Sequence, residues 1–144
     1  MSIRLKLDGF NDLIKEIEKA GGKTESATMA CMEKSAAIMQ DELKTQMRTA
    51  EAPNDLIDAM PDPIIENDYG KITARVGYKK GTYDPTNLSD GYKVVFLNYG
   101  TPRRKKHGKE RARGFIQKAK SKAKRKINAE QEKTLKDILK GLKQ

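Results

Sequence analysis

Two long stretches of this 144-residue chain place apolar side chains at steps of three and four, the spacing of a helix with one buried face. The first stretch predicts a helix from Thr24, its N-cap, to near Ala50. The second predicts a long C-terminal helix that Phe115 opens, with a break or kink near Asn128. The apolar stripes consist of Met32, Ala36, Met39, Leu43 and Met47 in the first stretch, and of Phe115, Ala119, Ala123, Ile127, Leu135, Ile138, Leu139 and Leu142 in the second.

Shorter segments predict the strands of a small sheet. Alternating or continuous apolar runs indicate strands at residues 3–7, 63–66, 71–78 and 94–97, and helical spacing returns at residues 11–20 and for about one turn at 54–60. The run at 94–97 is apolar on both faces, which favours a central strand, entered at Tyr92 and ended by Gly100. These segments predict an α+β fold, in which two N-terminal helices, one of them long, and a long C-terminal helix pack on a mainly antiparallel sheet.

The length fits one domain spanning residues 1–144, large enough to bury a core without metals or disulfides. Turn-forming residues predict a mobile loop at 79–93, and a second, basic loop is expected at 102–114. Hydrophobic residues make up only 36% of the chain and charged residues 35%, so we expect a thin core that a partner or further copies complete.

The positive charge belongs to one segment. Residues 103–126 contain 13 Lys or Arg and one acid, whereas the other 120 residues contain 17 bases and 19 acids. Such a density of cations would neutralise several phosphates in a salt-sensitive, sequence-independent manner. The alternative is a solvated helix face and loop that dock at most on an acidic partner. The sequence leaves both readings open.

Catalytic and metal-binding patterns are not visible. One cysteine, Cys31, and one histidine, His107, supply neither a disulfide nor a metal cluster, and His107 is expected to be a solvated loop residue. The acids between Asp55 and Asp68 match no calcium loop. No phosphate loop or nucleophile elbow occurs, so we expect no enzyme, no cofactor and no metal. Without a run of about 18 apolar residues, a soluble protein of the cytoplasm is expected.

Three groups of residues carry a resemblance to a known family. They are an opening strand that leads into a Gly-hydrophobic pair, Ile3-Arg4-Leu5-Lys6-Leu7-Asp8-Gly9-Phe10, an aromatic-Gly-Thr signature, Tyr99-Gly100-Thr101, and a helix start, Phe115-Ile116-x-x-Ala119. In this order the chain resembles the head-to-tail joining, or tail completion, proteins of long-tailed bacteriophages and prophages. Asn98 stands where that family commonly has an acid.

The resemblance implies a non-enzymatic structural protein of the virion neck, made in the host cytoplasm and assembled as a ring, usually a hexamer. Its implied partners are further copies of itself, a connector or neck protein on the head side, a tail tube or terminator protein on the tail side, and DNA in the channel as an open alternative. A free nucleic-acid-binding accessory protein acting through residues 103–126 is the second hypothesis. Expected partner or DNA contacts are Arg103, Arg104, Lys105, Lys106, Lys109, Arg111 and Arg113, and the expected structural residues are Tyr99, Gly100, Thr101 and Phe115.

Overall fold

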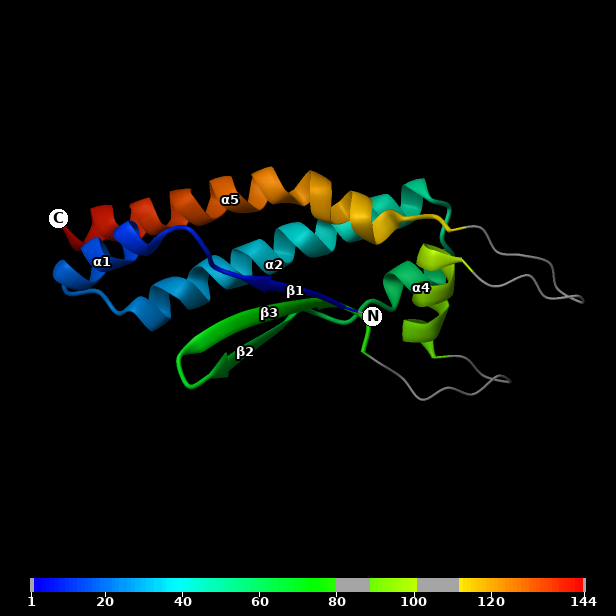
Figure 1. Ribbon diagram of the computed structural model, residues 1–144, viewed down its shortest axis with the longest axis horizontal. Coiled ribbons are helices and arrows are strands. Elements are labelled where there is room, and N and C mark those ends of the chain that lie inside the picture. Colours follow the sequence, from blue (N-terminus) through cyan, green and yellow to red (C-terminus); the bar gives the residue numbers. More distant parts are fainter. Residues whose placement is uncertain (1, 80–88, 101–111, 144) are drawn as a thin grey trace, which may run out of the picture.

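The computed structural model describes residues 2–79, 89–100 and 112–143 (Figure 1). Three strands and five helices make up this part of the chain, so the predicted α+β fold is confirmed. In chain order they are β1 (Ser2–Lys6), α1 (Asn11–Lys19), α2 (Thr24–Thr49), α3 (Asn54–Asp58), β2 (Ile64–Asp68), β3 (Lys71–Gly77), α4 (Asp90–Tyr99) and α5 (Phe115–Leu142).

The strands form an antiparallel sheet in the order β1-β3-β2. The register sets Ile3 opposite Val76 and Ile65 opposite Ala74, so apolar side chains share one face. Ile3, Ala74 and Val76 are buried, and α2 covers this face. The alternation at 71–78 therefore predicted the correct buried face.

The two long helices lie side by side and run in opposite directions, with α1 against the C-terminal half of α5 (Figure 1). The larger of two apolar clusters joins the sheet, α2, α3, α4 and the first half of α5. A smaller cluster joins α1 to α2 and to the end of α5 through Ile17, Cys31 and Leu135. Eleven of the 25 buried hydrophobic residues in the described chain belong to the two predicted stripes, whereas Ile138 is half-buried and Leu142 is exposed.

Two details of the long helices were predicted wrongly. Lys23, not Thr24, is the N-cap of α2, and the Thr24 hydroxyl instead donates to Glu18 Oε1 at 2.6 Å. The break expected near Asn128 does not occur, because α5 is continuous from Phe115 to Leu142. Three residues after Asn128, Gln131 is buried and donates through Nε2 to Ser35 Oγ on α2 at 3.0 Å.

The central strand predicted at 94–97 is wrong, because these residues lie within helix α4. A short apolar run does not distinguish a buried strand from a buried helix. In the helix the buried positions are Gly91, Val94 and Asn98, spaced by three and four, while Val95, Phe96 and Leu97 are half-buried. The loop predicted at 79–93 is correspondingly wrong at residues 90–93, which are helical; residues 80–88 lie outside the described part of the chain.

Candidate functional site

The helices on either side of the basic loop are bonded to each other. At the end of α4, the carbonyl oxygens of Leu97 and Asn98 accept hydrogen bonds from the backbone nitrogens of Arg113 (3.0 Å) and Gly114 (3.1 Å). The Asn98 side chain adds a third bond, because its Oδ1 accepts from the backbone nitrogen of Ile116 at 2.9 Å. We call these contacts the α4–α5 junction. They hold together the two segments that flank residues 101–111.

Asn98 acts as a helix cap supplied from another helix. The N-cap of α5 is Gly114, which has no side chain and adopts φ +63°, so it cannot satisfy the first N–H groups itself. Asn98 is 1% exposed and supplies the missing acceptor to Ile116. Its Nδ2 is buried and has no hydrogen-bond partner among the described residues. An asparagine within an otherwise apolar run was the sequence signal for this role, but it was not recognised as a cap.

Gly100 ends α4 with φ +83°, in the left-handed region that glycine adopts without strain. Its backbone nitrogen donates to Phe96 O at 2.8 Å. The ring of Tyr99 is 54% exposed, whereas Phe115 is completely buried at the start of α5. Tyr99 and Gly100 follow Asn98 directly, and Phe115 lies between Gly114 and Ile116, so the aromatic-Gly signature and the start of the last helix both adjoin the junction. Thr101 lies outside the described residues.

Arg113 also connects this junction to the end of α2. Its Nη1 donates to the backbone oxygens of Ala50 (3.0 Å) and Glu51 (3.1 Å), which follow the last residue of α2. A cation at this position is favourable because the C-terminal end of a helix carries partial negative charge. Arg113 was predicted to contact DNA or a partner, but its guanidinium also binds the protein's own backbone. The other six predicted contacts, Arg103, Arg104, Lys105, Lys106, Lys109 and Arg111, lie outside the described residues.

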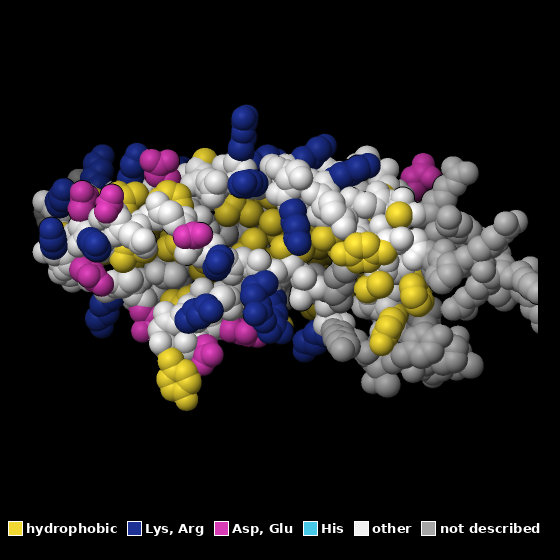
Figure 2. All heavy atoms as spheres, viewed as in Figure 1, with side chains coloured by type: hydrophobic (Ala, Val, Ile, Leu, Met, Phe, Trp, Pro, Cys, Tyr) yellow, Lys and Arg dark blue, Asp and Glu magenta, His cyan; other side chains and the backbone are white. Residues whose placement is uncertain are grey.

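The first half of α5 continues the positive surface. Its cations are exposed, and Figure 2 shows Lys and Arg side chains along the edge that α5 forms. Only Lys126 makes an ion pair within the described residues of this stretch. The others, which we call the α5 cation face, are Lys118, Lys120, Lys122, Lys124 and Arg125.

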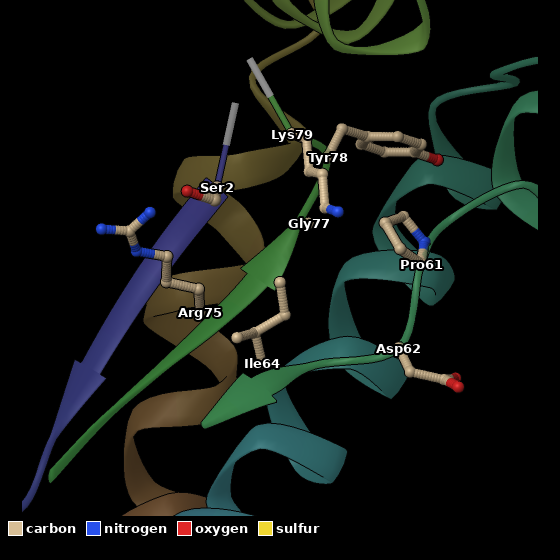
Figure 3. Close-up of a pocket in the computed structure, with 8 residues that line it drawn as sticks. All are labelled: Ser2, Pro61, Asp62, Ile64, Arg75, Gly77, Tyr78 and Lys79. Carbon is tan, nitrogen blue, oxygen red and sulfur yellow. The ribbon is translucent and has the colours of Figure 1, made fainter. Parts of the chain in front are cut away.

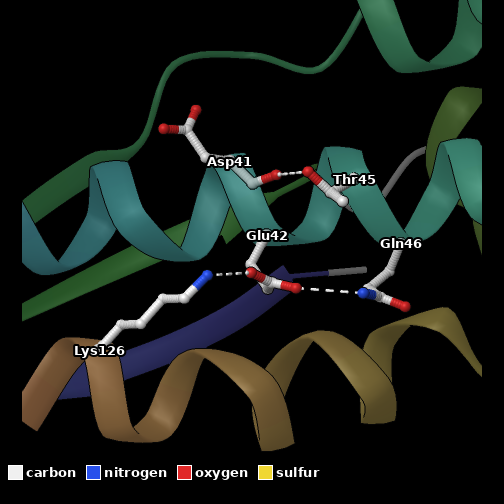
Figure 4. A network of polar contacts seen from close by, with 5 residues as sticks. All are labelled: Asp41, Glu42, Thr45, Gln46 and Lys126. Atoms are coloured by element: carbon white, nitrogen blue, oxygen red, sulfur yellow. Dashed lines mark hydrogen bonds and ion pairs between the residues drawn. The ribbon is translucent and has the colours of Figure 1, made fainter.

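The partner of Lys126 is Glu42 on α2, whose carboxylate is 3.1 Å from Lys126 Nζ (Figure 4). Glu42 Oε1 also accepts from Gln46 Nε2 at 3.1 Å. The hydrogen bond from Gln46, followed by that from Lys126, lowers the pKa of Glu42 below its ordinary value of 4.5. This group links α2 to α5, so Lys126 belongs to the fold as well as to the basic segment.

Groups that could support catalysis are sparse in the described residues. No cluster of three or more His, Cys, Asp or Glu side chains that could hold a metal occurs in the described ranges. Cys31 is fully buried, and desolvation raises the pKa of its thiol to about 11, which leaves it protonated at neutral pH. His107 lies outside the described residues.

Comparison with known proteins finds no match: no family model, no curated protein and no solved structure is significantly similar to the chain. Within residues 2–79, 89–100 and 112–143, no helix is long and apolar enough to span a bilayer.

Proposed function

We propose that this protein is a non-enzymatic structural component of the neck of a long-tailed bacteriophage, where it joins the DNA-filled head to the tail as a ring. The proposal rests on the resemblance carried by residues Ile3 to Ala119. Its partners would be copies of itself, a connector or neck protein on the head side, and a tail tube or terminator protein on the tail side.

The α4–α5 junction is the observation that supports this proposal most. The aromatic-Gly signature and the Phe115 helix start are separated in sequence, yet three hydrogen bonds join the residues beside them, Leu97 and Asn98 on α4 to Arg113, Gly114 and Ile116. Motifs that act as one structural unit are stronger support for a shared architecture than isolated matches. The acid commonly found in the family at the position of Asn98 could accept the same hydrogen bond from Ile116.

The surface of helix α4 is the observation in favour of assembly with other subunits. Beside its buried side, α4 carries four apolar or aromatic residues at steps of three and four that are half-buried or exposed: Tyr92, Val95, Phe96 and Tyr99. Figure 2 shows hydrophobic side chains at the surface over α4. An apolar helix face that is half-buried rather than fully buried is typical of protein–protein contacts.

Disruption of this gene in the producing phage tests the proposal. Electron microscopy of the lysate should show separate full heads and finished tails, and addition of the purified protein should restore joined, infectious particles. The Gly141→Ala variant, altered in α5 away from the junction, should restore joining as the wild type does. Intact particles from the disrupted phage would refute the neck function.

The α5 cation face favours a second candidate, a sequence-independent nucleic-acid-binding protein. Five exposed cations within eight residues, without ion pairs among the described residues, would neutralise phosphates spaced along a duplex. In this function residues 103–126 would act directly on DNA or RNA, outside any virion structure.

Binding to fluorescent duplex DNA at several salt concentrations tests this candidate. Each phosphate contact contributes about 0.9 to the slope of log affinity against log salt. Replacing Lys118, Lys122 and Arg125 by alanine should reduce both affinity and slope, as should the same change at Arg103, Arg104, Lys105 and Lys106. Lys133→Ala with Lys140→Ala, at the other end of α5, is the matched control. Unchanged binding in both test variants would rule the candidate out.

A further inference from the structure

Tyr69, at the tip of the β2–β3 hairpin, is an aromatic residue that is fully exposed to solvent. Its exposure reaches 105% of the reference value, the largest among the exposed hydrophobic residues of the described chain. It also adopts φ +51°, and Gly70 follows with φ +87°. Positive φ at both central residues is the feature of a type I′ turn, which favours Asn-Gly. A tyrosine there is strained, and burial does not compensate for the strain.

The hairpin tip is held in place. The backbone nitrogen of Gly70 donates to Asn67 Oδ1 at 3.0 Å, and Asn67 Nδ2 donates to Glu25 Oε1 on α2. The turn is thus fixed internally and tied to the longest N-terminal helix. A rigid, exposed tyrosine is the kind of side chain that anchors protein interfaces, because little conformational entropy is lost when it binds.

A pocket of about 200 Å³ lies at the other end of the same hairpin (Figure 3). Its apolar wall includes Pro61 and Ile64, and Ile64 is 41% exposed. Arg75 and Lys79 line it as well, whereas the carboxylate of Asp62 points away from the pocket in Figure 3. Tyr69 and Ile64 are two of the four large exposed hydrophobic residues in the described chain, so both ends of one hairpin carry apolar surface.

The two ends are complementary. An aromatic ring fits an apolar wall beside a guanidinium or ammonium, because the face of the ring attracts cations. Asp68 precedes Tyr69, and Lys79, which forms no ion pair within the described residues, lies at the pocket. Tip and pocket are separated by the seven residues of β3, about 20 Å, so they cannot meet within one chain.

We infer that Tyr69 of one copy inserts into the pocket beside Ile64 and Arg75 of a second copy. This contact uses different surfaces on the two molecules, so it is heterologous and generates a ring or an open filament. The inference rests on the proposed function and names the contact through which the subunits of the neck ring associate.

Sedimentation equilibrium of the purified full chain, from about 10 μM to about 1 mM, tests the contact. The wild type should associate as concentration rises. Tyr69→Asn, which removes the tip, and Ile64→Glu, which blocks the pocket, should each weaken association at least tenfold. Leu142→Asn, an exposed apolar residue at the end of α5, is the matched control and should associate as the wild type does.

Mixing the two variants makes the test specific. Tyr69→Asn retains an intact pocket and Ile64→Glu an intact tip, so a mixture should form dimers and nothing larger. Tyr69→Asn should also melt at a higher temperature than the wild type, since asparagine suits the turn, which excludes unfolding as the cause of lost association. A monomeric wild type at every concentration, full association of Tyr69→Asn, or no dimer in the mixture would overturn the contact. Each of these outcomes leaves the gene-disruption test of the neck function to be decided separately.

Discussion

Replacing Asn98 by alanine tests the α4–α5 junction directly. The change removes the acceptor of the Ile116 N–H, which is buried at the first turn of α5. A buried donor left unsatisfied costs about 1–3 kcal/mol, and loss of a helix cap by itself costs about 1 kcal/mol. Removal of Nδ2, a buried donor with no partner in the described part of the chain, offsets part of this loss. We expect a net loss of about 2 kcal/mol, or a fall in melting temperature of roughly 5 °C for a domain of this size.

Urea unfolding followed by circular dichroism measures this loss. Asn98→Asp keeps an acceptor beside the N-terminus of α5, where a negative charge is favourable, so it should retain more stability than Asn98→Ala. Asn128→Ala, an exposed asparagine of α5, is the matched control and should change the free energy of unfolding by less than about 0.5 kcal/mol. If the alanine and aspartate variants of Asn98 are equally stable, the hydrogen bond to Ile116 does not support the junction.

Three further predictions concern the fold around this junction. Gly100→Val should lower the free energy of unfolding by more than about 1 kcal/mol, because φ +83° strains a β-branched residue. A thermal melt that matches the wild type would contradict this. Gly141→Ala, within α5, is the control and should not destabilise the protein. Phe115→Ala should lower the free energy of unfolding, measured in urea, by about 3–5 kcal/mol, since Phe115 is fully buried. Phe96→Ala, at a half-buried position, is the comparison. If the two variants lose equal stability, the Phe115 ring contributes little to the core. Glu42→Gln should be less stable than the wild type at pH 7, and the difference should shrink as the pH falls below 4.5. A carboxyl with a lowered pKa stabilises the fold while it is ionised and loses that contribution on protonation. Exposed Asp41→Asn is the control for Glu42, and a pH-independent difference would contradict the role of its charge.

The spacing of apolar residues in the sequence was sufficient to predict an element and its buried side where only one face of that element is buried. The stripes of α2 and α5 and the alternation of β3 were predicted correctly, because apolar side chains must face the core at the period of the backbone. Boundaries at Gly100 and at Phe115 were predicted because glycine and a buried aromatic mark such positions, but the element that ends at Gly100 was predicted as a strand and is helix α4. The charge of residues 103–126 is likewise a property of composition alone.

The tertiary structure decided two things that the spacing of apolar residues leaves undetermined: the conformation of residues 94–97 and the contacts between distant segments. Residues 94–97 form a continuous apolar run, which does not distinguish a strand from a helix. In the tertiary structure they are part of helix α4, and Val94 joins the larger apolar cluster. The sequence contains Asn98 and Arg113 but does not reveal their partners. Asn98 meets Ile116, and Arg113 meets the backbone at Ala50, only when α2, α4 and α5 come together. The strain at Tyr69 and the pocket at the opposite end of the hairpin depend on backbone angles and on three strands lying side by side. Sequence patterns therefore determined the elements that bury one face, whereas the tertiary structure determined the helical state of residues 94–97, the junction and the surfaces available for assembly.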